Sequence, residues 1–564
     1  MTSFARKAKM RLKIAGIIKA ALMDAIEGGR ISLDKGLIPP VIVEKPKKEE
    51  FGDFSTNIAM LLARSLNMKP VDAAGIISEC IASLSLIRKC EVKGPGFINI
   101  FLDDSYWFST LLEIVNKRDY GTCDAGAGKK IIVEFVSANP TGPLHIGHGR
   151  GAAVGDALSN ILKAAGYCVT REYYINDRGR QMQALGESVE LRCRELQGEK
   201  VELGKDHYKG AYIKEIAEEY LSDKGRDRPF RVLHGYLRED IEEFAREAML
   251  KRIKKDLSDF GITFDVWRSE CDIFGSGAVN EALLLLKEKG VVYENEGALW
   301  FKTTGFGDDK DRVLVKADGE LTYFATDIAY HREKAERGFD QIVNVWGADH
   351  HGYEARVRAG LKALGFDDER LRIIFIQLVS LLRAGAPVAM GKREGEFVTL
   401  RQVMDEVGKD ACRFFFLSRK SDAHLEFDLE LAKKQAPENP VYYVQYCHAR
   451  LFSIMEFAAE RGVMAPRDLN PEILKKLGKD EIELIRHLSM FEECVEKSAL
   501  SMEPHRITFY LTELAGLFHS YYNKTRVVSE DLLLTQARLI LCGAVATVVE
   551  NGLGLLGISA PDKM

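Results

Sequence analysis

The sequence feature that most constrains the fold is a short apolar run at residues 131–136 that leads, through a loop, into a long helical pattern at residues 152–165. The loop contains Asn139-Pro140-Thr141-Gly142-Pro143, and its prolines and glycine end the strand pattern. A strand, a loop and a helix N-terminus in this order form a nucleotide-binding crevice, because the unpaired N–H groups and the positive dipole end of the helix face a ligand phosphate. The stretch therefore predicts a doubly wound, Rossmann-like α/β domain with a parallel sheet.

The tetrapeptide His145-Ile146-Gly147-His148 stands at the start of the helical pattern. His145 and His148 are three residues apart, so they share a helix face and can reach the same phosphates. Gly147 leaves no side chain between the helix and a nucleotide, so a purine base could lie flat on the backbone. The alternative interpretation is that two surface imidazoles cap an ordinary helix.

Length and composition limit the classes of protein. A chain of 564 residues is too long for one core, and we expect three or four domains. The net charge of -5 excludes a uniformly basic nucleic-acid coat but allows local basic faces. The ten cysteines include no Cys-x-x-Cys pair and no cluster at zinc spacing, which indicates a reducing compartment, and we expect a cytoplasmic protein. The apolar residues 539–558 are interrupted by Glu550 and Asn551, so we expect a buried terminal helix and no membrane span.

The first part of the chain, residues 1–120, combines helical patterns with a strand-like run at residues 92–100, which predicts a small α+β domain. Its basic residues, such as Lys45, Lys47 and Lys48, could contact a phosphate backbone, although a charge run is more often a solvated face.

More strand patterns follow the first helix, and we expect the Rossmann-like domain to span residues 128–428. Strands are predicted at residues 168–175, 312–316 and 341–346, and the charged, mainly helical residues from about 190 to 300 indicate an insertion. Gly347 and Asp349 come just after the last of these strands, where an aspartate can accept hydrogen bonds from ribose hydroxyls. A helix N-cap explains Asp349 equally well.

Two later stretches carry candidate binding groups. If residues 321–329 are helical, Tyr323 and Asp327 lie on one face, and a carboxylate beside a phenol could bind a guanidinium through two charge-assisted hydrogen bonds. Taken alone, an intrahelical hydrogen bond is the simpler explanation of that pair. Glycines flank two cations in Met390-Gly391-Lys392-Arg393, which favours a loop able to close on a polyphosphate.

Residues 429–564 are predicted to be wholly helical. Aromatic and cationic side chains recur here at helical spacing, at Tyr442, Tyr446 and Arg450 and again at Tyr522 and Arg526. Such a face can stack unpaired bases and hold their phosphates, whereas packing inside a helix bundle is the alternative.

Together these stretches resemble an arginyl-tRNA synthetase, one of the class I aminoacyl-tRNA synthetases, over nearly the whole chain. His145-Ile146-Gly147-His148 matches the class signature, and Met390-Gly391-Lys392-Arg393 falls where the class has a second, lysine-bearing loop. Strings typical of the arginine enzyme are Ser137-Ala138-Asn139-Pro140, Asn176-Asp177 with Gln181, Asn439-Pro440-Val441, and Ser559-Ala560-Pro561. Residues 52–57 resemble the family's N-terminal domain, which contacts the tRNA elbow.

The resemblance implies a ligase that activates arginine with ATP and transfers the arginyl group to the 2′-hydroxyl of the terminal adenosine of tRNA(Arg). It implies that His145, His148 and Lys392 act on the phosphates, with Mg²⁺ bridging the phosphate oxygens and no metal site made of protein side chains. The residues implied for the nucleotide are Gly147, Gly347, Asp349, Met390 and Lys392, and those for arginine are Ser137, Asn139, Tyr323, Asp327 and His350. Those implied for tRNA are Tyr442, Tyr446, Arg450, Tyr522 and Arg526, and the family suggests a monomer.

The second signature departs from the family pattern, because it reads Ala-Met-Gly-Lys-Arg and lacks the first lysine and the usual serine. Some members carry another lysine shortly before the first signature, but Gly142 occupies that position here, so we expect Lys392 to be indispensable. Two other hypotheses compete. An adenylyltransferase of the same superfamily would lack the helical C-terminal domain, and a non-catalytic RNA-binding relative would have lost one of the site residues.

Overall fold

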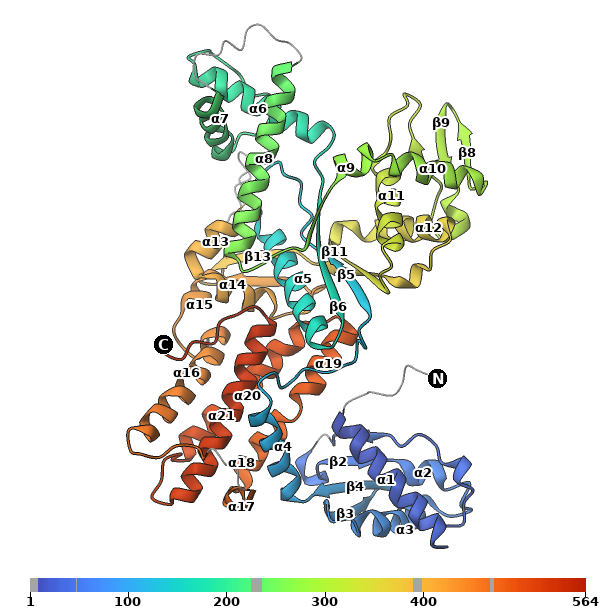
Figure 1. Cartoon of the computed structure of the whole chain (residues 1–564), viewed down its shortest axis with the longest axis vertical. Helices are drawn as coiled ribbons and strands as arrows, with labels where there is room; N and C mark the ends of the chain where they lie inside the picture. The colour runs from blue at the N-terminus through green and yellow to red at the C-terminus, as the bar shows by residue number, and fades with distance from the viewer. Residues whose placement is uncertain (1–8, 47, 225–235, 389–397, 467–470) are drawn as a thin grey trace.

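The computed structural model describes residues 9–46, 48–224, 236–388, 398–466 and 471–564. Figure 1 shows a central region around α5 from which a helical lobe, a mixed lobe and a C-terminal helical lobe extend, with the blue N-terminal unit set to one side. The predicted fold class is confirmed: a parallel-sheet α/β domain lies between an N-terminal α+β unit and a C-terminal helical domain.

The N-terminal unit packs helices against an antiparallel sheet of order β1-β2-β4-β3. Its strands are β1 (Val43–Glu44), β2 (Phe54–Thr56), β3 (Ile87–Lys93) and β4 (Phe97–Leu102), and its helices are α1 (Lys9–Glu27), η1 (Lys35–Leu37), η2 (Glu49–Phe51), α2 (Ile58–Leu62) and α3 (Pro70–Ala82). The single strand expected at residues 92–100 is wrong. It is a β3–β4 hairpin, because Gly94 and Gly96, with φ of 55° and 128°, turn the chain around Pro95.

The central sheet is wholly parallel, with the order β12-β11-β5-β6-β7. Its strands are β5 (Lys130–Glu134), β6 (Cys168–Ile175), β7 (Val266–Ser269), β11 (Gln341–Gly347) and β12 (Leu371–Ile376). The chain leaves β5 toward β6 and β7 on one side, and β11 and β12 lie on the other. The strand order therefore reverses between β5 and β11, and ligands of such sheets bind at that switch point.

Helices cover both faces of the sheet, as the doubly wound prediction requires. On β5, Ile131 and Val133 join the core that contains α5 (Ile146–Ala164), whereas Ile132 packs with α11 (Tyr323–Glu336) and α12 (Glu354–Leu364). Since strand side chains alternate between faces, Glu134 points to the same side as Ile132, toward α11.

The region expected as a helical insertion, residues 190–300, is more varied. The helices α6 (Arg180–Leu196), α7 (Ala211–Lys224) and α8 (Tyr236–Asp259) form a lobe with its own core. The strand β7 then returns to the central sheet, and α9 (Glu270–Gly275) and α10 (Ala278–Glu288) follow it. A separate antiparallel sheet contains β8 (Val292–Asn295), β9 (Ala298–Phe301) and β10 (Arg312–Val315), with η3 (Thr303–Phe306) between the last two strands.

Two sequence expectations are therefore wrong in this region. The central sheet resumes at β7 and not at residue 312, since four residues of mixed character give too short a pattern to separate from the helices around them. The strand at 312–316 is real, but it pairs with β9 in the antiparallel sheet.

A third small sheet follows β12 and joins the central domain to the C-terminal helices. It contains β13 (Val379–Arg383), β14 (Ala386–Pro387) and β15 (Leu425–Asp428), next to α13 (Leu400–Val407), α14 (Lys409–Phe416) and α15 (Leu429–Lys433). The short helices η4 (Ala348–Tyr353) and η5 (Asp368–Arg370) flank α12.

The C-terminal domain is helical, as predicted. Its helices are α16 (Pro440–Ala459), α17 (Pro471–Leu474), α18 (Lys479–Leu488), α19 (Phe491–Ser501), α20 (His505–Lys524) and α21 (Leu532–Leu555). Within the described ranges, α21 alone has the length and apolarity of a membrane-crossing helix, and 61% of its most apolar window is buried inside the protein. The expectation of a buried terminal helix agrees with that burial.

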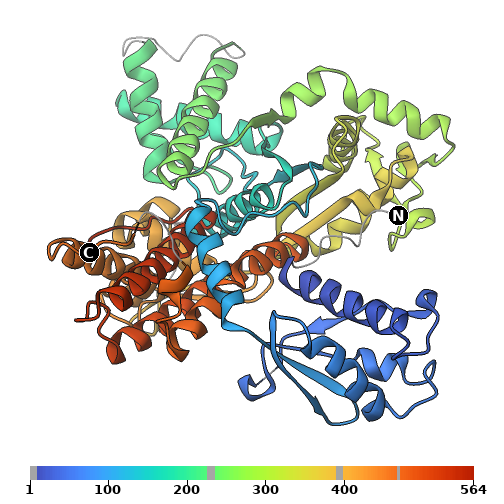
Figure 2. The same ribbon diagram turned by 60° about the horizontal axis from the view of Figure 1, so that its bottom comes forward.

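The helix α4 (Asp104–Asn116) lies outside the N-terminal unit, although its residues fall within the expected 1–120 domain. Figure 2 shows this light-blue helix between the N-terminal unit and the red C-terminal helices. Just after it, the carbonyl groups of Arg118 and Tyr120 accept hydrogen bonds from Asn551 Nδ2 at 2.9 and 3.0 Å. The compact N-terminal unit therefore ends near Leu102.

Candidate functional site

The loop after β5 enters the switch point in a strained conformation. Val136 and Ser137 have φ of 68° and 43°, in the left-handed region that a β-branched residue rarely adopts. Tyr173 holds the loop, because its hydroxyl donates to the Ala138 carbonyl at 3.0 Å and accepts from the Ala138 N–H at 3.1 Å. Strain of about 1–3 kcal/mol per residue is typical of binding sites that must be preorganised.

His145 and His148 cap the N-terminus of α5 and stack on each other, with ring centroids 3.6 Å apart. His145 Nδ1 accepts from the N–H groups of Gly147 and His148 at 3.1 and 3.4 Å, and His148 Nδ1 accepts from the His145 N–H at 3.4 Å. Each neutral ring therefore carries its proton on Nε2. The capping interpretation and the phosphate-binding interpretation are compatible, since capping uses one nitrogen of each ring and the other is a donor.

Burial lowers the pKa of both rings, and for His148 the nearby His145 adds to the effect and brings the pKa to about 3. Both imidazoles are therefore neutral at physiological pH. Gly147 keeps this geometry possible: a Cβ at that position would lie 2.9 Å from His145 Cε1.

The second signature loop falls outside the described residues, and with it Met390 and Lys392. The residues that follow this loop in the sequence are described, and they contact the segment that carries the first signature. Val398 O accepts from the Ile146 N–H at 3.3 Å, and the Leu400 N–H donates to Leu144 O at 2.7 Å. Thr399 forms a β-bridge with His145 and caps α13.

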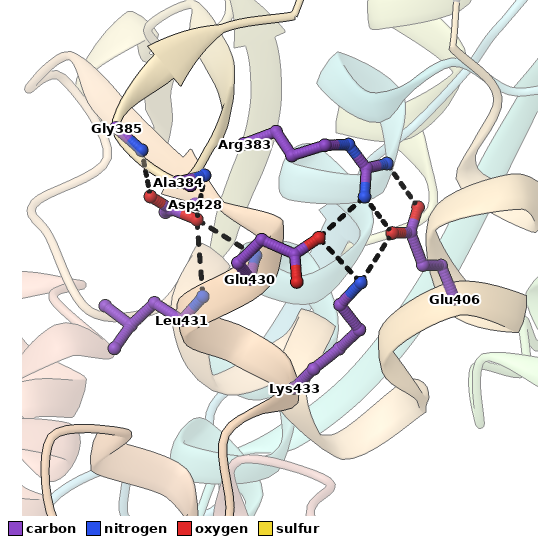
Figure 3. A network of polar contacts seen from close by, with 8 residues as sticks. All are labelled: Arg383, Ala384, Gly385, Glu406, Asp428, Glu430, Leu431 and Lys433. Atoms are coloured by element: carbon purple, nitrogen blue, oxygen red, sulfur yellow. Dashed lines mark hydrogen bonds and ion pairs between the residues drawn. The ribbon is translucent and has the colours of Figure 1, made fainter.

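A surface network ties the segments on both sides of that loop together (Figure 3). Arg383, at the end of β13, contacts Glu406 of α13 and Glu430 of α15, each at 2.7 Å, and Lys433 contacts the same two carboxylates. Asp428 accepts from the N–H groups of the turn at Ala384 and Gly385 and from the first turn of α15. The network holds the hairpin, α13 and α15 in one arrangement.

Carboxylates gather on the other side of the switch point. The Asp327 carboxylate on α11 accepts a hydrogen bond from the Tyr353 hydroxyl of η4. Burial, with the charge of Glu134, raises the pKa of Asp327 to about 7 against the opposing effects of Tyr353 and Lys334. The unpaired charge is costly in this surrounding, which favours a cationic ligand.

Glu270, directly after β7, is a site residue that the sequence interpretation missed. It is 4% exposed, and its Oε2 has no hydrogen-bond partner among the described residues. Burial and the charge of Asp327 raise its pKa to about 7. The available signal was an acidic residue just past a short strand at the carboxyl edge of the sheet.

Tyr323 and Asp327 are both on α11, as expected, but the phenol that meets Asp327 belongs to Tyr353. Tyr323 is 59% exposed, and its hydroxyl lies 3.5 Å from the position of a Cβ on Gly179, in the loop after β6. The intrahelical explanation of the pair fails for the same reason, since the hydrogen bond to Asp327 comes from η4.

Ser137 and Asn139 lie on the strained loop after β5, and Ser137 contacts Glu134, one of the carboxylates near Asp327. Ser137 Oγ donates to Glu134 Oε1 at 2.8 Å and accepts from the Tyr174 N–H at 3.2 Å. Asn139 Nδ2 donates to Gln181 Oε1 at the start of α6. The loop is therefore fixed from β5, β6 and α6 together.

The tip of β11 carries Gly347, Asp349 and His350. Gly347 is the N-cap of η4, so the N-cap interpretation of Asp349 is wrong. A Cβ on Gly347 would lie 2.5 Å from Asp349 Oδ1, and His350 Nε2 lies 3.6 Å from Asp349 Oδ2. The His350 ring meets Tyr353 edge to face at 6.3 Å, which connects this tip to the Asp327 pocket.

The five expected tRNA residues lie close together on α16, on α20 and just after α20. Tyr442 and Tyr446 stack with ring centroids 5.7 Å apart, and the Arg450 guanidinium lies 4.5 Å from the Tyr446 ring and 4.8 Å from the Tyr522 ring. A cavity of about 990 Å³ opens here; its lining includes Tyr446, Arg450, Tyr522, Lys524, Arg526 and Lys563. The bundle-packing alternative does not account for the exposure of Tyr522 and Arg526.

Among the described residues, no group of three or more His, Cys, Asp or Glu side chains is arranged to hold a metal ion. A nucleotide-bound Mg²⁺, whose ligands are mainly phosphate and water oxygens, fits this site without such a group.

Comparison with known proteins agrees with the geometry. The family described as "tRNA synthetases class I (R), catalytic domain" matches residues 110–428, "Arginyl tRNA synthetase N terminal domain" matches residues 12–102, and "DALR anticodon binding domain" matches residues 444–564.

Relatives named arginine–tRNA ligase match nearly the full length. The one from Geobacter sp. (strain M21) is 52% identical over 97% of this chain and 99% of its own, and the one from Citrifermentans bemidjiense is 51% identical over 97% and 99%. The arginyl-tRNA synthetase structure from Thermus thermophilus has the same fold, with a TM-score of 0.74 at 22% identity over 98% of this chain and all of its own. The chain therefore belongs to the arginine–tRNA ligase family of class I tRNA synthetases.

Proposed function

We propose that this chain activates arginine with ATP, giving arginyl-adenylate and pyrophosphate, and then transfers the arginyl group to the 2′-hydroxyl of the terminal adenosine of tRNA(Arg). Family membership over nearly the whole length supports the ligase activity. The observation that carries the choice of arginine is the pair of carboxylates formed by the partly buried Asp327 and the buried Glu270, which faces the same switch point as the histidines at the start of α5.

In the activation step, a carboxylate oxygen of arginine attacks the α-phosphorus of ATP, a C–O–P bond forms, and pyrophosphate leaves. The step needs no covalent enzyme intermediate, so positioning and stabilisation of the phosphate charge are the work of the protein. His145 and His148 donate from Nε2 to phosphate oxygens without changing their own charge, and the N-terminus of α5 adds its dipole. We assign Lys392 to the leaving pyrophosphate. The contacts of Val398 and Thr399 with the N-terminus of α5 support that assignment, because these residues follow the Lys392 loop closely in the sequence.

The nucleotide lies across the switch point in this proposal. Gly147 and Gly347 are positions where a Cβ would collide with a neighbouring group, which supports close approach of the base and ribose to the backbone. Asp349 accepts from the ribose hydroxyls, and Met390, which lies outside the described residues, is assigned to the nucleotide as well. A Mg²⁺ ion held mainly by phosphate and water oxygens would supply positive charge to the phosphates.

The guanidinium of arginine is planar and presents paired N–H donors. Two carboxylates can accept hydrogen bonds from these donors in a geometry that the ammonium of lysine cannot reproduce. We assign this role to Asp327 and Glu270, with Tyr323 closing the pocket. Ser137, Asn139 and His350 hold the amino and carboxylate groups. Because a buried carboxylate left without its partner is costly, discrimination against lysine or citrulline of about 10⁴ follows from binding alone.

Three regions divide the contacts with tRNA(Arg). The N-terminal unit, which ends near Leu102, contacts the elbow; residues 128–428 perform the chemistry; and residues 429–564 receive the anticodon. Stacking of Tyr442 on Tyr446 beside Arg450, together with the cavity lined by Tyr522 and Arg526, supports base binding there. We infer that the protein acts as a monomer in the cytoplasm.

The test is ATP–pyrophosphate exchange across the twenty amino acids, with and without total tRNA. Exchange with arginine, whether alone or only with tRNA, supports the proposal. Exchange with a different amino acid contradicts the assignment of the acidic pocket. A folded protein that binds tRNA but shows no exchange under any condition contradicts the ligase activity itself.

A further inference from the structure

A lysine is buried beneath the crevice, where the proposed reaction has no direct use for it. Lys334 of α11 is 0% exposed. Its ammonium pairs with Glu134 Oε2, donates to Asn344 Oδ1 at 3.0 Å and lies 4.2 Å from the centre of the Tyr330 ring. A buried ammonium is expensive unless all its protons have partners, and here the three partners come from β5, β11 and α11 itself.

The Glu134 branch leads to the strained loop. One oxygen of Glu134 pairs with Lys334, and the other accepts from Ser137 Oγ at 2.8 Å. Ser137 Oγ in turn accepts from the Tyr174 N–H at 3.2 Å, so its proton is directed to Glu134. This bond fixes the residue whose φ is 43°, immediately before the loop carries Asn139 into the crevice.

The Asn344 branch leads to Asp327. Since Asn344 Oδ1 accepts from the ammonium, its Nδ2 must be the donor to His331 Nε2, at 2.7 Å. His331 then carries its proton on Nδ1 and donates to the Asp327 carbonyl at 2.8 Å. Burial and the charge of Lys334 lower the pKa of His331 to about 3, in agreement with a neutral ring.

We propose that Lys334 is a positioning residue for the amino-acid substrate: through Glu134 and Asn344 it fixes Ser137 and Asp327, the groups between which arginine is held. This inference rests on the proposed function. A positioning role can be distinguished from a purely structural one, because buried ion pairs can often be replaced by neutral residues of similar volume with little change in stability. A positioning role predicts that such a replacement leaves the fold intact and weakens arginine binding.

The main test uses the double variant Lys334→Met/Glu134→Gln, which removes both buried charges and keeps the side-chain volumes. We expect the apparent KM for arginine in ATP–pyrophosphate exchange to rise about tenfold or more, because small displacements of binding groups have effects of this size. The KM for ATP should stay within about twofold, since the histidines lie on the other side of the sheet from α11.

The matched control is Arg337→Met/Glu172→Gln. That ion pair joins the C-cap residue of α11 to the central strand β6, and Glu172 is likewise 0% exposed, but its carboxylate accepts from Arg337 and Tyr330 and not from Ser137. We expect this variant to keep the wild-type KM for arginine. Equal increases in both variants would mean that α11 has merely loosened, and would overturn the proposal.

A folded Lys334→Met/Glu134→Gln protein with the wild-type KM for arginine would overturn it as well. If that protein does not fold, Ser137→Ala is compared in the wild-type and Glu134→Gln backgrounds. The proposal requires Ser137→Ala to raise the arginine KM less in the second background, and equal factors contradict it. Wild-type exchange is measured in the same assay, and its absence with arginine would remove the proposed function and the inference together.

Discussion

Two sides of the switch point differ in their electrostatics: the histidine side, with His145 and His148, and the carboxylate side, with Asp327 and Glu270. His145 and His148 are neutral donors whose pKa values are lowered by burial, and they stand at the positive end of α5. Asp327 and Glu270 are acids whose pKa values are raised to about 7, mainly by burial, with the charge of Glu134 adding to the shift of Asp327 and the charge of Asp327 adding to that of Glu270. In the proposed function, phosphates bind to oriented dipoles, whereas the guanidinium binds to formal charges that only a cation neutralises. Under this proposal, the carboxylate side provides the selectivity for the amino acid and the histidine side provides the contacts for the phosphate chemistry.

The largest effect on kcat is expected from His145→Asn, which separates the capping role of the ring from its role toward the phosphates. Asparagine keeps an oxygen acceptor for the first-turn N–H groups, so the free energy of unfolding should change by less than about 1 kcal/mol. Losing the Nε2 donor should lower kcat for exchange about 10²-fold, as for other donors to a developing oxyanion. Chemical denaturation and exchange kinetics check the two expectations, and an unchanged kcat would place the phosphates elsewhere.

The next effect is expected from Gly147→Ala, whose Cβ would lie 2.9 Å from His145 Cε1. Displacement of the ring should lower kcat about tenfold or more without changing the KM for arginine. Gly151→Ala on the same helix is the control, because its Cβ would meet nothing nearer than Ile376 Cγ1 at 4.0 Å. That variant should keep full activity and gain helix stability of up to about 1 kcal/mol. Equal losses in both would point to α5 as a whole.

The carboxylate side should respond to pH and the histidine side should not. Asp327 has a folded pKa of about 7 against an ordinary value of 3.8, so it takes up a proton as the pH falls through 7. Arginine affinity should then fall toward tenfold per pH unit below that point, while the KM for ATP stays nearly flat. The titratable groups that face Asp327 are Tyr353, Glu134, Lys334, Glu270 and Tyr174.

The same shift has a consequence for stability. Between about pH 4 and 7 the folded protein holds a proton that the unfolded chain has released, so unfolding stability falls as the pH rises through this window. Bound arginine should offset that loss, giving a larger rise in Tm at pH 8 than at pH 6. Glu270 titrates in the same range, so the pH dependence of Tm in Glu270→Gln shows which of the two acids causes most of the change. A flat arginine KM from pH 6 to 8.5 contradicts the pocket assignment.

The smallest effect is expected from Arg383→Met. Arg383 belongs to the network of Figure 3, which includes none of the residues assigned to ATP or arginine. Its partners Glu406 and Glu430 are partly exposed, and exposed ion pairs contribute at most about 1 kcal/mol. We expect kcat to fall only a few-fold with both KM values unchanged, measured by exchange kinetics. A specific rise in the arginine KM would show that the network reaches the carboxylate side.

Much of the central fold and the histidine side of the candidate site could be predicted from the local sequence pattern. The strands β5, β6 and β11 have runs of strand length bounded by turn residues, and the histidines stand at a strand–helix joint that the local sequence reveals. The acidic pocket is different, because Tyr353 and Glu270 reach Asp327 only through the packing of η4 and α9 around α11. Periodicity on α11 suggested Tyr323 as the partner, but it cannot say which neighbouring element supplies a hydroxyl. Likewise, β7 was missed because four residues carry too little pattern.

The most direct measurement of the central claim is calorimetric binding of arginine and of ATP to wild-type protein and to Asp327→Asn, with tRNA present in both. The variant keeps the volume of the side chain and its acceptor for the Tyr353 hydroxyl, so the fold should persist. We expect arginine binding to weaken by about 10³-fold or more, the cost of an unmatched guanidinium, while ATP binds as before. Arginine binding as tight as in the wild type would contradict the division of the crevice into a charged side and a neutral one.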